Sequence, residues 1–77
     1  MDLKIILFGQ LGDVAGTNEI LVRSVTNTAD LQEQLKEQYP SVAASKYIIA
    51  VDKKMIQENT PLKEDNLVAL LPPFSGG

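Results

Sequence analysis

Apolar and polar residues alternate along this chain in a pattern that predicts five strands and one helix. Short apolar or alternating runs that are bounded by turn-forming residues are typical of strands. The expected strands are residues 3–8, 19–25, 47–51, 55–56 and 67–71. Between the first two, Gly9, Gly12 and Gly16 match neither G-x-G-x-x-G nor a P-loop, so this stretch is expected to be a plain hairpin connection.

The helix is expected to begin just after Asn27 and to end before Pro40. Asn27, followed three residues later by Asp30, resembles a capping box in which Asp replaces Glu. Leu31 and Leu35 are four residues apart and lie on one side of such a helix, which is therefore amphipathic. A proline disfavours the helical conformation of the residue before it, and Pro40 should stop the helix.

A hairpin, one helix crossing a face of the sheet and further strands form the plan of a β-grasp domain. This is an α+β fold with a mixed sheet and one main helix packed on one face. We expect residues 1–71 to form this domain and residues 72–77 to leave it as an extended C-terminal tail.

The sheet face that the helix leaves open is expected to be apolar. Residues 67–71 are apolar throughout, and Ile6 and Phe8 alternate with the core positions of the first strand. Because a solvated face would carry polar residues, this face is expected to bind a partner, with Phe8 and Leu71 as candidate contacts. The alternative is that loops of the same chain cover it.

The composition argues against independent catalysis. The chain of 77 residues is 44% hydrophobic and has no cysteine and no histidine. It therefore lacks disulfides, thiolate zinc ligands, a nucleophilic thiol and an imidazole base, so neither a metal site nor an enzyme acting alone is expected. The net charge of −3 and the pI of about 4.7 argue against nucleic acid as a partner. No apolar run is long enough for a membrane span, and a cytoplasmic location is expected.

The C-terminal residues form the candidate functional site. Pro72 and Pro73 favour a stiff, extended stem, whereas Gly76 and Gly77 can enter a narrow channel. An extended tail places the terminal carboxylate roughly 20 Å from Leu71. The alternative is a frayed terminus without a function.

Several short segments and the ending form a pattern that is found in a known family. They are residues 7–11, the helix from Asn27 to Tyr39-Pro40, residues 50–52, Pro61-Leu62 and residues 68–77. This pattern resembles the MoaD-type small subunit of molybdopterin synthase, in the MoaD/ThiS family of ubiquitin-like sulfur carriers. The last ten residues carry most of the specificity, since ThiS-type carriers usually lack the proline pair.

The resemblance implies that the protein works through its own C-terminus. A MoeB-type activating enzyme uses ATP to adenylate Gly77, and sulfur transfer converts this acyl-adenylate to a thiocarboxylate. The tail then enters the MoaE-type large catalytic subunit of a heterotetramer and donates sulfur to the pterin precursor, forming the dithiolene. The carrier itself binds no cofactor tightly.

By the same resemblance, Gly77 is the sulfur acceptor and Gly76 lets the tail thread the active sites. The residues that line the contact with both partners are Pro72, Pro73, Phe74 and Ser75.

The chain departs from the family pattern at three places. Gly12-Asp13 stands where an Arg-Glu pair is common, residues 64–67 replace Asp-Gly-Asp-Glu, and Phe74 is larger than the usual valine. These departures leave open the roles of Asp13, Asn66 and Leu67.

Two other classes of function stay open. One is another ubiquitin-like carrier, serving thiamine, thio-tRNA or cysteine synthesis, or a protein modifier that forms isopeptide bonds. The other is a β-grasp interaction module with an inert tail. Appending one residue after Gly77 separates the last class, because only a carrier should lose its function.

Overall fold

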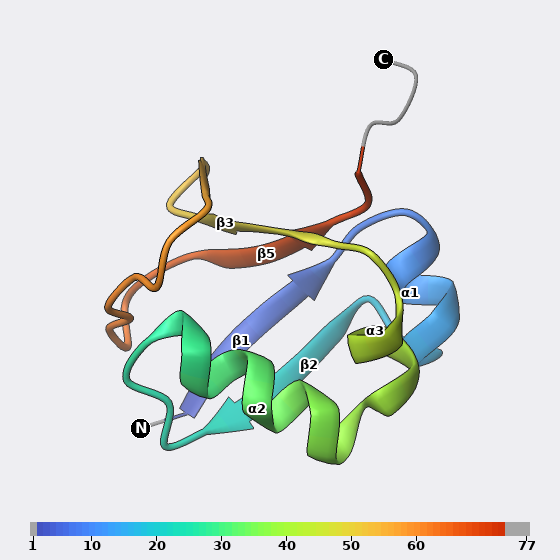
Figure 1. Ribbon diagram of the computed structural model, residues 1–77, viewed down its shortest axis with the longest axis horizontal. Helices are drawn as coiled ribbons and strands as arrows, with labels where there is room; N and C mark the ends of the chain where they lie inside the picture. Colours follow the sequence, from blue (N-terminus) through green and yellow to red (C-terminus); the bar gives the residue numbers. More distant parts are fainter. Residues whose placement is uncertain (1, 74–77) are drawn as a thin grey trace.

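The computed structural model describes residues 2–73, which form one five-stranded sheet with helices packed against it (Figure 1). The strands are β1 (Asp2–Leu7), β2 (Glu19–Arg23), β3 (Ile48–Val51), β4 (Lys54–Ile56) and β5 (Val68–Leu71). The helices are α1 (Gln10–Ala15), α2 (Thr28–Gln38) and α3 (Pro40–Ala44).

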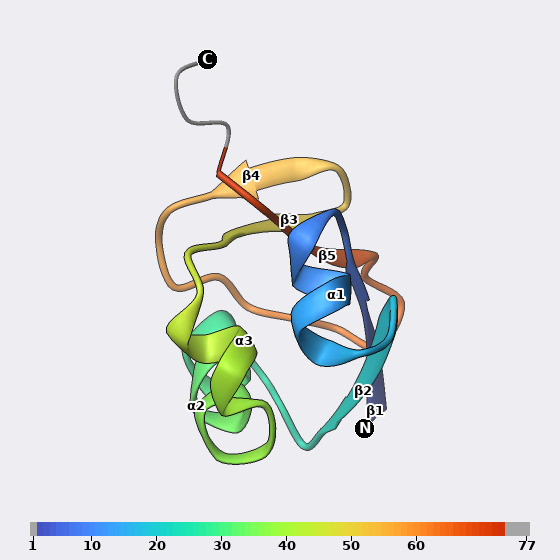
Figure 2. The same ribbon diagram turned by 90° about the vertical axis from the view of Figure 1, so that its right-hand side faces the viewer.

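The sheet is mixed, with the strand order β2-β1-β5-β3-β4. β1 and β5 run parallel, and the other neighbouring pairs are antiparallel. Figure 2 shows α2 and α3 together on one side of the sheet, as the sequence predicted for the main helix. The predicted β-grasp fold is therefore confirmed, and the strand that leads to the C-terminus lies in the middle of the sheet.

Alternate strand residues point to the face under the helices, which we call the inner face. Leu31 and Leu35 of α2 are completely buried against it, which confirms the predicted helical stripe, and Tyr39 adds partly buried surface. Each such large apolar side chain contributes about 1.5–3 kcal/mol when it leaves water. The core consists of Leu3, Ile5, Leu7, Leu11, Ile20, Val22, Val25, Leu31, Leu35, Val42, Ile49, Val51, Leu62, Val68 and Leu70.

The start of α2 follows the predicted cap. The Asn27 side chain accepts a hydrogen bond of 2.9 Å from the Asp30 backbone N–H. The Asp30 carboxylate in turn accepts bonds from the hydroxyl and the backbone N–H of Thr26, and these bonds lower the pKa of Asp30. The helix ends before Pro40 as expected, but Pro40 also begins the short helix α3, which the sequence analysis missed. A proline suits the first turn of a helix because it has no N–H to leave unpaired.

The connection between β1 and β2 differs from the prediction. The two strands form the expected antiparallel hairpin, but their connection contains helix α1 and is not a plain glycine-rich turn. The buried side chain of Leu11 anchors this helix to the core. Gly16, with φ of 77°, ends it in the left-handed conformation. One buried leucine in a glycine-rich stretch is too weak a pattern to predict a helix of this length.

Candidate functional site

The described chain leaves the sheet through Pro72 and Pro73, directly after β5. Pro72 is half-buried and Pro73 is exposed, and neither belongs to a strand. A proline cannot donate a ladder hydrogen bond, so β5 ends where the first of them stands. The remaining predicted tail residues lie outside the described residues: Phe74, Ser75, Gly76 and Gly77. Their extended conformation and their roles stay predictions.

Gly9 fixes the place where this stem leaves the domain. It has a φ of 57°, and a Cβ at this position would lie 3.1 Å from the Pro72 Cγ atom. The neighbouring Phe8 backbone N–H donates to the carbonyl of Leu70 over 3.0 Å, which ties the same turn to β5. Only glycine combines this conformation with so close an approach. The glycine pattern predicted only a turn at Gly9, because its contact with the stem joins residues 63 positions apart in the chain.

The structure brings the two predicted docking residues together on the outer face, the side of the sheet away from α2 and α3. β1 and β5 pair Leu7 with Leu70, so Phe8 and Leu71 are the next neighbours in this parallel register. On its other side Leu71 pairs with Ile48 of β3. Phe8 is 47% exposed, and Leu71 and Ile48 are half-buried. This row therefore offers apolar surface beside the stem.

A second apolar row lies next to the first. Ile6, Ala69, Ala50 and Met55 pair across four strands, and Met55 is 59% exposed. The two rows, which we call the apolar area, are Phe8, Leu71, Ile48, Ile6, Ala69, Ala50 and Met55. Phe8 and Met55 are exposed, Ile6, Ile48, Ala69 and Leu71 are half-buried, and Ala50 is buried between them. The outer face near the stem is therefore apolar and partly open, as expected, and its binding to a partner stays a prediction.

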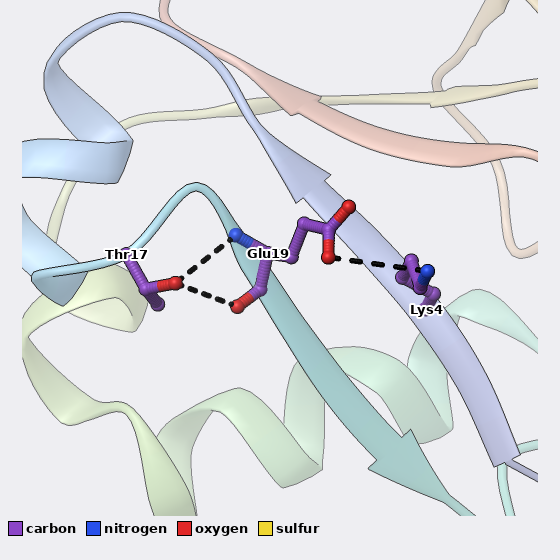
Figure 3. A network of polar contacts seen from close by, with 3 residues as sticks. All are labelled: Lys4, Thr17 and Glu19. Carbon is purple, nitrogen blue, oxygen red and sulfur yellow. Dashed lines mark hydrogen bonds and ion pairs between the residues drawn. The ribbon is translucent and has the colours of Figure 1, made fainter.

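The outer face becomes polar toward β2. Figure 3 shows the Lys4 ammonium directed at the Glu19 carboxylate, and their closest atoms are 3.9 Å apart. Both side chains are exposed, so this ion pair adds little stability. The outer face thus has an apolar area near the stem and, farther from it, a part in which charged residues surround the exposed Leu21.

A hydrogen-bond network holds the beginning of β5. The Asp52 carboxylate accepts bonds from the Leu67 backbone N–H over 2.8 Å and from the Asn66 side-chain amide over 2.7 Å. The Asn66 oxygen accepts from the Lys63 backbone N–H. Asn66 and Leu67, which depart from the family pattern, therefore help to set the start of the strand. No local sequence pattern indicated this network, because Asp52 lies fourteen residues before Asn66.

Tyr47 precedes Ile48 in the chain. Because β3 and β5 are antiparallel and Ile48 pairs with Leu71, Tyr47 lies at the end of β3 that is nearest to the stem. Burial raises the pKa of the Tyr47 phenol, and a hydrogen bond with Gln32 opposes that shift only in part. The phenol is thus protonated at neutral pH.

Across residues 2–73, no three Asp, Glu, His or Cys side chains gather as a possible metal site. None of the helices described there has the length and apolar character to span a bilayer.

The mixed five-stranded sheet and the stem on its central strand define a ubiquitin-like β-grasp domain. A sequence model described as the ThiS family matches residues 5–77, and the chain belongs to this family. The resemblance seen in the sequence is therefore confirmed.

Three relatives show the range of similar proteins. The molybdopterin synthase sulfur carrier subunit of Chlamydomonas reinhardtii is 29% identical over an alignment of 83 positions, which covers both chains completely. A chain in the complex of subunits 1 and 2 of molybdopterin-converting factor from Helicobacter pylori 26695 is 29% identical, with a TM-score of 0.61 and full coverage of both chains. The small archaeal modifier protein 1 from Methanosarcina acetivorans is 25% identical, with a TM-score of 0.80 over 99% of this chain and 96% of that one.

Proposed function

We propose that this protein is the sulfur-carrying small subunit of a molybdopterin synthase and that the carboxyl group of Gly77 carries the sulfur. The observation that supports this proposal most directly is the joining of a Pro-Pro stem to the central strand, beside the apolar area. The relative from C. reinhardtii, which matches over its whole length, is named for this function. The family match also runs to Gly77.

The proposed chemistry takes place at one acyl carbon. A carboxylate oxygen of Gly77 attacks the α-phosphorus of ATP on a MoeB-type activating enzyme, and pyrophosphate leaves. Hydrosulfide (HS−) from the sulfur donor then attacks the acyl carbon, displaces AMP and loses its proton, which leaves a thiocarboxylate. A free carboxylate resists such attack because its charge is delocalised, whereas the adenylate supplies a good leaving group. The thiocarboxylate sulfur then attacks a carbon of the pterin precursor and displaces an oxygen leaving group there. Water then cleaves the bond between the acyl carbon and sulfur, which leaves the sulfur on the pterin and returns Gly77 to a carboxylate.

The large subunit supplies the pterin-binding site in this proposal. The carrier has no histidine and no cysteine, so the acid-base groups for the transfer to the pterin come from the partner. The H. pylori complex of two subunits supports a partnership of this kind. Phe8 and Leu71 dock against the large subunit, and the stem directs Phe74, Ser75 and Gly76 into its pocket. Two carriers and two large subunits assemble as a heterotetramer, in a cytoplasmic setting.

A protein modifier is the second candidate function. The relative from M. acetivorans, whose name describes a modifier, is 25% identical and has a closely similar fold. The same acyl-adenylate gives an isopeptide bond when a lysine amine attacks it instead of sulfur. The fold serves both reactions equally, so the two functions differ in the partner and not in the carrier.

The test uses the full chain, a variant that lacks Gly77 and a variant with one alanine added after Gly77. Each is incubated with a MoeB-type enzyme, ATP and a sulfur donor, and its intact mass is measured. Only the full chain should show the mass change that replaces one oxygen by sulfur, and all three should unfold at the same temperature. Thiocarboxylate on the truncated chain would show that Gly77 is not the acceptor.

A second step separates the two candidates. The sulfur-loaded chain is mixed with the large subunit from the same genome and with the pterin precursor. Formation of the dithiolene supports the molybdopterin synthase assignment. Isopeptide-linked conjugates without dithiolene would assign the chain to the modifiers.

A further inference from the structure

The two edge strands of the sheet, β2 and β4, each have backbone N–H and C=O groups that point away from the sheet, and the two strands differ in what binds these groups. In an antiparallel pair, alternate residues turn their backbone N–H and C=O groups away from the partner strand. The Leu7 N–H donates to the Asn18 carbonyl over 2.8 Å, which sets this alternation for β2. Glu19, Leu21 and Arg23 therefore direct their backbone groups outward.

Side chains already occupy the outer edge of β2. The Thr17 hydroxyl donates to the Glu19 carbonyl over 3.1 Å and accepts from the Glu19 N–H over 3.4 Å (Figure 3). At the other end of the strand, the Gln34 side-chain amide accepts from the Arg23 N–H and donates to the Arg23 carbonyl. Another strand could pair here only after it displaced both contacts. The β2 edge is protected in this way.

The outer edge of β4 has no such cover. The Asp52 N–H donates to the Leu67 carbonyl over 2.7 Å, so Ala50 of β3 bonds toward β5, and its neighbours Ile49 and Val51 bond toward β4. Met55 and the following Gln57 consequently turn their backbone groups outward. No side-chain hydrogen bond found within residues 2–73 reaches either backbone. This edge is open for strand addition.

A groove of about 450 Å³ runs beside the open edge, between α2 and the β3-β4 hairpin. Ile49 and Ile56 give it apolar surface, and Thr28 and Gln32 of α2 form its opposite wall. Added strands place alternate side chains on each face of a sheet, so those on the inner face of an incoming strand would enter this groove.

We propose that a second copy of the chain binds this edge, with β4 antiparallel to β4 about a two-fold axis at Ile56. In this register Met55 and Gln57 of one copy exchange backbone hydrogen bonds with Gln57 and Met55 of the other. Ile56 meets Ile56, and Lys54 lies opposite Glu58 on both sides of the axis. The two sheets join into one of ten strands.

The charge pattern favours a second copy over an unrelated peptide. Lys54 lies in β4, and Glu58 stands at a bend two residues after the strand ends at Ile56. Both are exposed, carry opposite charges and stand two residues from Ile56 along the chain, so the proposed pairing extends the strand to Glu58. A two-fold axis therefore makes the segment complementary to itself, and opposite charges that face each other across strands are stabilising. This proposal does not depend on the sulfur-carrier function, since β5 and the stem lie outside the interface, and Met55 is the only residue of the apolar area that belongs to β4.

The test measures sedimentation equilibrium of the full chain over a range of concentrations at low salt. The chain should show a monomer-dimer equilibrium. Lys54→Glu places like charges across both sides of the axis and should raise the dimer dissociation constant about tenfold. The double variant Lys54→Glu with Glu58→Lys should restore dimerisation to within about threefold of the parent chain. Lys63→Glu, an equal charge change in a loop away from β4, should leave it unchanged.

Hydrogen exchange gives a second, independent measurement. The amides of Met55 and Gln57 should exchange more slowly as the chain concentration rises, whereas the Leu21 amide on β2 should not change. A chain that sediments as a monomer at every concentration overturns the proposal, as does a dimer that is indifferent to Lys54→Glu. Protection of Met55 and Gln57 only after the large subunit is added would assign the edge to that partner instead and would equally overturn it.

Discussion

Leu70 and Leu71 are adjacent in the chain and chemically identical, yet they lie on opposite faces of β5. Leu70 is completely buried on the inner face among the core residues. Leu71 is half-buried on the outer face, between Phe8 and Ile48. The inner face stabilises the fold, and the outer face presents a surface beside the stem. Hydrophobicity alone therefore does not tell which leucine is buried in the core and which faces the outer surface, because the strand alternation decides it.

The largest difference between the two faces should appear in stability. Leu70→Ala removes a completely buried side chain and should lower the free energy of unfolding by about 2–5 kcal/mol. Leu71→Ala, the matched change one residue later, should cost less than about 1 kcal/mol because part of that side chain already contacts water. Chemical denaturation of both variants measures the difference. Equal losses would show that the outer face belongs to the core.

The next effect concerns binding and should be confined to the outer face. Leu71→Asp should preserve the fold but weaken binding to the large subunit about tenfold or more, because a carboxylate would lose its water at the interface. Leu21→Asp is the matched control, since Leu21 also lies on the outer face but far from the stem, on β2. Isothermal titration calorimetry measures both. Unchanged affinity of the Leu71 variant would contradict the docking role of the apolar area.

A smaller effect is expected where the stem meets the outer face. Gly9→Ala and Gly16→Ala both place a side chain at positive φ, which costs about 1–2 kcal/mol of stability in each case. Only Gly9→Ala also brings a Cβ against Pro72, because nothing lies within 4 Å of the corresponding position at Gly16. The Gly9 variant alone should therefore slow thiocarboxylate formation several-fold. If both variants form thiocarboxylate at the parent rate, the contact with Pro72 does not position the tail.

The smallest effect is expected in the charged part of the outer face. Lys4→Ala removes the ion pair with Glu19 and should cost about 0.5 kcal/mol or less, and this cost should vanish at high salt. A double-mutant cycle with Glu19→Ala isolates the pair, since the Thr17 hydroxyl bonds only to the backbone of Glu19. A coupling energy that is large and independent of salt would mean that this pair matters to the fold.

Local patterns in the sequence predicted most of the fold. The strand order along the chain, the cap at Asn27 and the stripe of Leu31 and Leu35 each depend on residues a few positions apart. Helix α1 was missed because Leu11 is its only large side chain that is buried, and α3 was missed because Pro40 was interpreted only as a stop signal.

The site was predicted in a different way. Phe8 and Leu71 were chosen from the apolar alternation of the strands, and the register of β1 and β5 makes them neighbours. The contact of Gly9 with Pro72 and the bonds of Asp52 with Asn66 join distant parts of the chain. No local pattern encodes such contacts, because they exist only after the strands have paired.

The central position of β5 also has a mechanical consequence. In the proposed cycle the tail is drawn out of one enzyme pocket and inserted into another, so tension enters the domain along this strand. β1 on one side and β3 on the other hold it, and a force parallel to the strand loads both hydrogen-bond ladders at once. An edge strand would be peeled away one bond at a time. In that proposed cycle the domain resists unfolding each time the tail is withdrawn.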